Sequence, residues 1–266
     1  MRTIVITGGT DGIGAGLARH HLAQGDTVVA IGRDEVKGAA LARLGGHFVR
    51  ADLSLVAENL RVVDLLKSRF EAIDALILCA RYFRSHRYET VEGFEACFAL
   101  EYLSRFTLSH ELLDRLEAAP APVVLNVSGP GAPKPEIRWD DLGFCRGYSG
   151  VEAQFHAGRA NDLLGLAFAT EHPDARTKYI LVNPGSVASS FAGEFDPETA
   201  ALVQRMKRVA TPVDRIVPHL AALVDAPPAD PVSAFAVSRR VDPRMSEVDD
   251  RAAARLHRLT TGLLRH

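Results

Sequence analysis

The amino-acid sequence predicts one doubly wound α/β domain over residues 1–266, with a parallel sheet and helices on both of its faces. Three observations lead to this prediction. Short β-branched and apolar runs alternate with longer amphipathic stretches, which is the rhythm of βαβ units. The short runs are almost continuously apolar, as in strands that are covered on both faces. The chain has 266 residues, 47% of them hydrophobic, which suits a single α/β domain with a full core.

The elements are placed by the same patterns. The apolar runs predict strands at residues 2–7, 27–31, 47–50, 73–78, 122–127, 177–183 and 232–237. The amphipathic stretches predict helices at residues 13–24, 35–44, 55–70, 91–117, 150–171, 198–208, 212–224 and 247–264. Two stretches rich in proline, 129–135 and 226–231, are expected to be loops, because the chain beyond the second is too short to fold alone.

Composition excludes several classes of function. The net charge of -2 provides no basic field for nucleic acid or an acidic membrane surface. The three cysteines, Cys79, Cys97 and Cys145, lack the spacing of metal ligands or of a disulfide framework. The first residues enter a strand pattern directly, and no apolar run is long enough to span a membrane. We therefore expect a cytoplasmic protein that acts on a small molecule, without a metal, nucleic acid or membrane as partner.

The strongest motif follows the first strand. Glycines at positions 8, 12 and 14 end that strand and open the first helix. Such glycines allow a tight turn and a close approach of the backbone to a pyrophosphate, while the helix N-terminus offers free N–H groups and a positive dipole end. The turn predicts a dinucleotide site that includes Gly8, Thr10, Asp11, Gly12, Ile13 and Gly14.

The spacing Thr-Gly-x-x-x-Gly-x-Gly over Thr7–Gly14 resembles that of the short-chain dehydrogenase/reductase family, which implies a Rossmann fold. Residues 32–40, residues 137–142 and the C-terminal helix at 247–264 resemble its retinol-dehydrogenase-like branch. The resemblance covers nearly the whole chain. It implies a nicotinamide cofactor and a loop, here residues 190–211, that closes over the substrate.

The resemblance also assigns cofactor contacts beyond the glycine turn. Arg33 stands where the family selects the adenosine ribose, and an arginine there can pair with a 2′-phosphate. NADP(H) is therefore expected to bind more tightly than NAD(H), unless Arg33 is only a solvated residue at the start of a helix. The remaining contacts that the family implies fall on Asp52, Leu53, Ala80, Pro184, Gly185, Val187 and Ser189.

The catalytic positions of the family hold other residues in this chain. Ala160 and Asn161 resemble the sequence that follows the family's lysine, so the tyrosine and lysine positions fall on Gln154 and Gly158. The serine and asparagine positions fall on Gly129 and Glu101. Glutamine does not titrate and glycine has no side chain, so this pair cannot supply the family's proton transfer.

Few side chains remain to replace the missing pair. Tyr148 precedes Gln154 by six residues and is a candidate to reach the pocket from its rim. Glu101 is expected to face the cleft, where burial would raise its pKa, or else to form a structural ion pair with Arg81. His156 lies about 200° around the helix from Gln154 and is expected at the surface or at an interface.

Three functions remain open on the sequence alone. The first is an atypical NADP-dependent oxidoreductase that acts on a small organic substrate. The second is a non-redox enzyme, such as a dehydratase, isomerase or cyclase, and the third is a cofactor-binding pseudoenzyme. A homodimer or homotetramer is also expected, because the apolar residues Leu163, Leu164, Leu166 and Phe168 exceed what one helix face needs.

Overall fold

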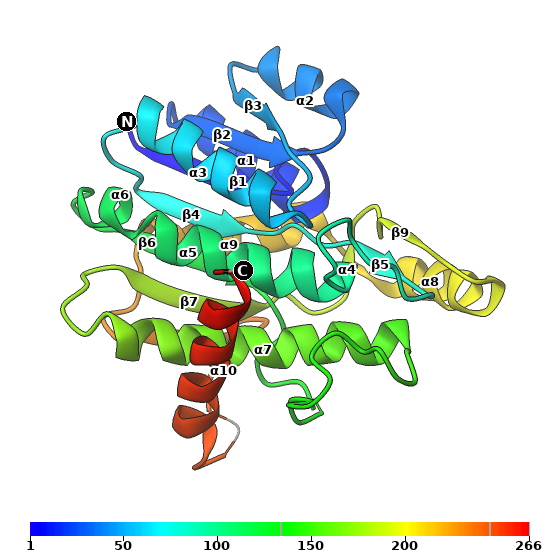
Figure 1. Cartoon of the computed structure of the whole chain (residues 1–266). Helices are drawn as coiled ribbons and strands as arrows, with labels where there is room; N and C mark the ends of the chain where they lie inside the picture. Colours follow the sequence, from blue (N-terminus) through cyan, green and yellow to red (C-terminus); the bar gives the residue numbers. More distant parts are fainter. Residues whose placement is uncertain (134, 245, 266) are drawn as a thin grey trace.

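The computed structural model of the protein describes residues 1–133, 135–244 and 246–265. Eight strands form its main sheet: β1 (Thr3–Thr7), β2 (Thr27–Gly32), β3 (His47–Arg50), β4 (Ala75–Leu78), β6 (Val123–Val127), β7 (Lys178–Asn183), β11 (Val232–Ala236) and β12 (Arg239–Val241). Their order is β12-β11-β7-β6-β4-β1-β2-β3 (Figure 1). Neighbouring strands run parallel, except that β12 runs antiparallel to β11 at one edge.

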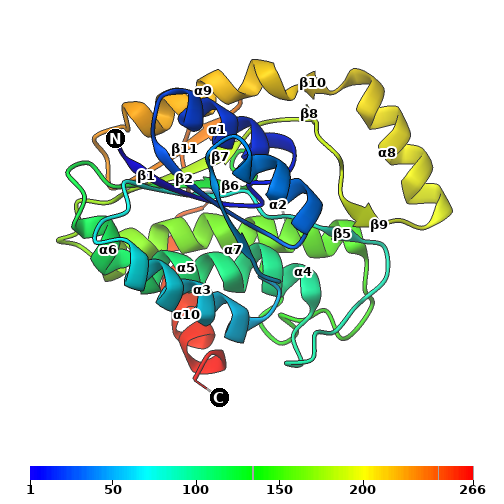
Figure 2. The same cartoon turned by 90° about the horizontal axis from the view of Figure 1, so that it is seen from above.

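Helices cover both faces of this sheet, as Figure 2 shows. One layer contains α1 (Gly12–Ala23), α2 (Glu35–Ala42) and α9 (Val213–Asp225), and it encloses one hydrophobic cluster. The opposite layer contains α3 (Val56–Arg69), α5 (Ser104–Glu111) and α7 (Gly150–Glu171), and it encloses the larger cluster. This arrangement confirms the predicted doubly wound α/β fold.

Local side chains fix where several helices begin. Asp34 accepts hydrogen bonds from the N–H groups of Val36 (2.9 Å) and Lys37 (3.0 Å) at the start of α2. Ser149 caps α7 in the same way, through the N–H of Glu152 at 3.4 Å. Such caps satisfy N–H groups that have no partner within the helix. The predicted starts of these helices therefore agree with the structure to within a residue.

The helix predicted over residues 91–117 is wrong in its extent and continuity. The structure has α4 (Ala96–Phe98), the π-helical turn η1 (Ala99–Leu103), α5 and α6 (Leu113–Glu117) in succession. Gly93 has a positive φ of 83°, so a continuous α-helix cannot run through this position from residue 91. The Glu95 carboxylate then accepts hydrogen bonds from the N–H groups of Cys97 (2.9 Å) and Phe98 (2.7 Å) and starts α4. Periodicity alone does not reveal this cap.

The C-terminal helix α10 (Asp249–Leu263) packs across α7 on the outside of that layer (Figures 1 and 2). Arg159 of α7 and Asp249 form a buried ion pair with N–O distances of 3.0 and 2.5 Å. The apolar residues that suggested an oligomer are buried in the same cluster as Ala253 and Leu256 of α10. The homodimer or homotetramer stays a prediction, but these apolar residues no longer argue for it.

The structure confirms the helix predicted at residues 198–208 and adds short strands to the region at residues 190–211. This region contains β9 (Gly193–Glu194) and α8 (Pro197–Val209), and it lies between β8 (Val187–Ala188) and β10 (Thr211–Pro212). Strand β9 pairs in parallel with β5 (Phe83–Arg84), and β10 pairs with β8. None of the helices in the described ranges is long and apolar enough to cross a membrane.

Candidate active site

The glycine turn lies at the carboxyl edge of the sheet, between β1 and α1. Gly12 has a positive φ of 48°, and a Cβ on it would lie 2.9 Å from Cβ of Ser189. A Cβ on Gly14 would lie 2.3 Å from the carbonyl oxygen of Gly8. Both positions therefore require glycine. The first brings residue 189, at the far end of the predicted cofactor site, against the start of α1.

A charge pair lies at the start of α1. The carboxylate of Asp11 accepts a hydrogen bond from the N–H of Gly12 at 2.7 Å and forms an ion pair with Lys37 of α2. Burial alone would raise the pKa of Asp11, but hydrogen bonds from Lys37 and Ser190 outweigh it and hold that pKa below its ordinary value. Lys37 was missed by the sequence analysis, although its place four residues after Arg33, in the first turn of a helix, was a usable signal.

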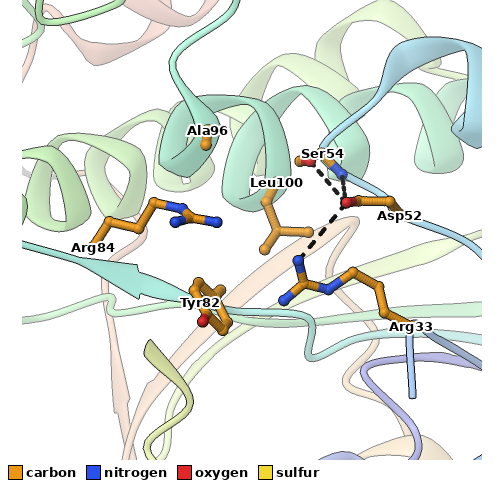
Figure 3. Close-up of a pocket in the computed structure, with 7 residues that line it drawn as sticks. All are labelled: Arg33, Asp52, Ser54, Tyr82, Arg84, Ala96 and Leu100. Atoms are coloured by element: carbon orange, nitrogen blue, oxygen red, sulfur yellow. Dashed lines mark hydrogen bonds and ion pairs between the residues drawn. The ribbon is translucent and has the colours of Figure 1, made fainter. Parts of the chain in front are cut away.

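A pocket lies beside Arg33, where the sequence predicts the adenosine end of the cofactor site (Figure 3). Nη1 of Arg33 lies 3.7 Å from Oδ2 of Asp52, and its guanidinium carbon lies 4.8 Å from the ring centroid of Tyr82. Half of the Arg33 side chain remains exposed. The pocket is lined by Arg33, Asp52, Ser54, Tyr82, Arg84, Ala96 and Leu100.

Three of the predicted cofactor contacts, Leu53, Ala80 and Val187, are buried or already engaged in hydrogen bonds. The side chain of Leu53 is buried in the core, and its carbonyl oxygen already accepts a hydrogen bond from Asn59 at 2.9 Å. The side chain of Val187 is also buried. Ala80 lies directly behind the glycine turn, where its N–H donates to Oγ1 of Thr7 at 3.2 Å. The buried side chains of Leu53 and Val187 therefore do not reach a ligand in this structure.

A second cluster, at and near positions that the resemblance assigns to catalysis, brings together Glu101, Gln154 and Arg81. Nε2 of Gln154 donates to Oε1 of Glu101 at 3.3 Å, and Nε of Arg81 lies 3.6 Å from Oε2. A second Arg81 nitrogen donates to Oε1 of Gln154. Glu101 is 5% exposed, while the Arg81 side chain is 58% exposed. The buried carboxyl is thus held between a neutral amide and a largely exposed cation.

The environment of Glu101 changes its acidity. Burial raises the pKa of Glu101, and the positive charges of Arg81 and Arg105 offset this only in part. A carboxyl with a raised pKa retains its proton closer to neutral pH and can exchange it with a substrate. Both expectations for Glu101, a raised pKa and an ion pair with Arg81, therefore agree with this geometry.

Tyr148 is engaged elsewhere. Its hydroxyl lies 3.3 Å from both the carbonyl oxygen of Arg84 and Oε1 of Glu95, so it donates to one of these acceptors. Its ring packs against a small cluster that includes Cys97 and Ala153. Burial and the negative charge of Glu95 raise the pKa of Tyr148 above its ordinary value. The hydroxyl is tied down and poorly acidic, which favours a structural role.

The remaining family positions offer no titratable group. Gly129 and Gly158 lack side chains, and Oγ of the neighbouring Ser128 is buried without a hydrogen-bond partner in the part of the chain that the structure describes. His156 was predicted at the surface or at an interface, and this is wrong, because the chain itself buries it. It is 1% exposed, packs against Phe144, and accepts a hydrogen bond from the N–H of Arg138 at 3.2 Å. A loop folded over α7 buries it.

A buried polar network holds the backbone around Glu101 in place. Arg105 is 3% exposed and donates to the carbonyl oxygens of Ala80 (3.0 Å) and Val127 (2.8 Å), at the ends of β4 and β6. Asn161 donates to the carbonyl oxygen of Glu101 at 2.7 Å. These bonds hold the strand ends and η1 together. Arg105 was not predicted, although an arginine between the apolar pairs Tyr102–Leu103 and Phe106–Leu108 was a visible signal.

A latch connects the loop at residues 190–211 to the segment that follows β4. It consists of β5, β9, Tyr82 and Phe195. Arg84 forms an ion pair with Glu194, and the hydroxyl of Tyr82 donates to the same carboxylate at 3.4 Å. The rings of Phe83 and Phe195 stack with centroids 5.3 Å apart. Because Tyr82 also contacts Arg33, the latch adjoins the adenosine end of the site.

Known proteins resemble this chain in sequence and structure. Residues 2–140 match the family described as short chain dehydrogenase. Polyprenol dehydrogenase from Homo sapiens is 30% identical over 64% of this chain and 54% of its own length. Retinol dehydrogenase 12 from Mus musculus is 32% identical over 71% of this chain and 62% of its own length. The first four curated relatives are matched over 54% to 62% of their length.

A solved structure extends the resemblance to the whole fold. An uncharacterized protein from Mycobacterium paratuberculosis superimposes with a TM-score of 0.76 at 25% identity. The match covers 100% of this chain and 94% of that protein. The similarity therefore includes the C-terminal half, which the family match does not reach.

Proposed function

From the membership of this chain in the short-chain dehydrogenase family, we propose that it binds NADP(H) and acts on a small organic substrate as an atypical oxidoreductase, with Glu101 as its proton-carrying group. The observation that carries the proposal is the buried carboxyl of Glu101, held by Gln154 and Arg81 where the family places its catalytic groups. Members of this family bind nicotinamide dinucleotides.

The residues present fit the dinucleotide. The glycine turn and the N-terminus of α1 would hold the pyrophosphate, since Lys37 balances the charge of Asp11 there. Arg33 and Lys37 would provide the cations for a 2′-phosphate, because both follow β2 on the same side of the site. The bound nicotinamide supplies or accepts a hydride. Gly158 provides no lysine to hold its ribose, so we expect weaker binding than in relatives with that lysine.

The chain's own residues would manage the proton. A protonated Glu101 donates from one oxygen while the amide of Gln154 orients the other. The exposed side chain of Arg81 must move outward first, because it lies against Oε2, the oxygen that would donate the proton. Its return would stabilise the carboxylate left behind. Glu101 would thereby take over the proton transfer of the family's catalytic tyrosine. We expect its pKa to suit that transfer less well, because the carboxyl has only one cation partner.

The test is an activity assay with matched variants. Wild-type protein should reduce simple aldehydes and ketones with NADPH about 10²- to 10⁴-fold more slowly than a family member with an intact tyrosine and lysine. Glu101→Gln should remove the remaining activity, whereas Glu111→Gln, at an exposed position on α5, should not. Gln154→Tyr with Gly158→Lys should raise the rate. A further Arg81→Gly change should remove the side chain that lies against Glu101.

Other outcomes distinguish the alternatives. A normal rate of reduction in wild-type protein, lost in Tyr148→Phe, would transfer the proton donor to Tyr148. Substrate turnover without NADPH consumption, abolished by Glu101→Gln, would indicate the dehydratase, isomerase or cyclase class. Tight NADPH binding with no turnover by wild type or by the restored variant would indicate a pseudoenzyme. Absence of NADPH binding in calorimetry would overturn the proposal entirely.

A further inference from the structure

Helix α8 projects from the body of the molecule, at the edge where β5 and β9 pair (Figures 1 and 2). It has 13 residues, of which only Val203 is buried. Asp196 caps its first turn by accepting a hydrogen bond from the N–H of Thr199 at 2.7 Å, and Pro197 occupies its first position. The helix is thus well formed locally, yet almost all of its surface faces away from the protein.

The outward surface of α8 is not uniformly polar. Leu202, Met206 and Val209 are 44%, 38% and 83% exposed. Their spacing of four and three residues places them on one face of the helix, where they form an apolar stripe. A helix stripe of this kind is normally buried against a core. Here the face that meets the protein contains Val203 instead, so the apolar stripe is left without a partner among the described residues.

Three cations accompany the apolar stripe. Arg205, Lys207 and Arg208 lie within four residues, against a single acidic residue, Glu198, in the first turn. Lys207 lies 5.6 Å from the ring centroid of Phe191, in the preceding loop. Neither Arg205 nor Arg208 forms an ion pair with any residue that the structure describes. The overall charge of -2 conceals this cluster, because it is a sum over the whole chain.

We propose that α8 rests on an anionic phospholipid surface. A short helix with an apolar stripe, low overall hydrophobicity and flanking arginines suits the boundary between headgroups and acyl chains. The stripe would enter that boundary, while Arg205 and Arg208 reach back to phosphate and carboxylate groups of the lipids. A second copy of the chain fits less well, because three side chains are far fewer than the 20 to 30 residues that each partner typically contributes to a stable interface.

This placement has a consequence for the candidate active site. Helix α8 follows β9 directly, so the loop that pairs with β5 through β9 would lie at the lipid surface. A substrate dissolved in the bilayer would then enter beside α8 without crossing water. The surface proposal is independent of the reaction that Glu101 performs, because it depends only on the exposed residues of α8.

Flotation of the full chain with vesicles tests the proposal directly. Protein should float with vesicles of phosphatidylcholine and phosphatidylserine in a 70:30 ratio, and should stay behind with pure phosphatidylcholine. High salt should reduce the floated fraction, since it screens surface charge. Each of Arg205→Gln and Arg208→Gln should weaken binding about fivefold. Leu202→Ser with Met206→Ser should weaken it by about tenfold or more.

Matched controls separate this surface from general stickiness. Leu60→Ser removes an apolar side chain of similar exposure, 43%, from α3, and Arg43→Gln removes an arginine from the end of α2. Neither should change flotation. Equal flotation of the stripe variant and wild type would overturn the proposal, as would failure of wild type to float with the anionic vesicles. So would a fall in molecular mass on Leu202→Ser with Met206→Ser, because a second copy would then cover the stripe.

Discussion

At the scale of single residues, the proposed preference for NADP(H) depends on Arg33. Its guanidinium is half exposed and makes only a loose pair with Asp52, so it can turn to a 2′-phosphate. We expect calorimetry to show tighter binding of NADPH than of NADH, and Arg33→Ala to reduce that preference by about tenfold. Arg43→Ala is the control, since it removes an arginine beyond the site. Equal affinities in the wild-type protein would contradict the assignment.

Glu101 makes a second residue-scale prediction, on stability. Its pKa is raised in the folded protein because burial penalises the charged form. Below the ordinary carboxyl pKa of about 4.3 the group is neutral in both states, and the penalty grows as pH rises through the folded pKa. Glu101→Gln should therefore raise the melting temperature by about 2 °C at pH 7.5 and change it little at pH 4. Thermal denaturation at both pH values checks this, and a destabilised variant at pH 7.5 would show that the pair with Arg81 outweighs burial.

At the scale of elements, the latch between β5 and β9 holds the loop at residues 190–211 against the segment that follows β4. Glu194 receives both the Arg84 ion pair and the Tyr82 hydrogen bond, so its removal leaves only backbone bonds and the stacked phenylalanines. Because ion pairs of exposed carboxylates contribute little, Glu194→Ala should speed amide exchange in this loop only about threefold. Hydrogen-exchange mass spectrometry measures the effect, with Glu198→Ala as control. Unchanged exchange in Glu194→Ala would mean that the Phe83–Phe195 contact holds the loop.

At the scale of the whole molecule, α10 decides whether the outer face of α7 is available to a second copy. The Arg159–Asp249 pair and the hydrogen bond between Tyr102 and Thr260 at 2.8 Å fix α10 there. We therefore expect that the predicted homodimer or homotetramer would use a surface other than this face of α7. Light scattering at micromolar concentration should give the same mass for wild type and for Leu259→Ser, at an exposed position of α10. A dimer in wild type that is lost in Leu259→Ser would instead place the interface on α10.

Local sequence patterns were enough to predict the alternation of strands and helices, the glycine turn and the position of Arg33 after the second strand. Each of these depends on residues within a few positions of one another. Only the tertiary structure decided which side chains meet. Arg81 and Gln154 are 73 residues apart, and Tyr82 and Glu194 are 112 apart, so no local pattern relates them. Burial of His156 and of the apolar residues on α7 likewise depends on segments that fold over them from elsewhere in the chain. Periodicity reports which face of an element is apolar, whereas the partner that covers it is set by long-range packing.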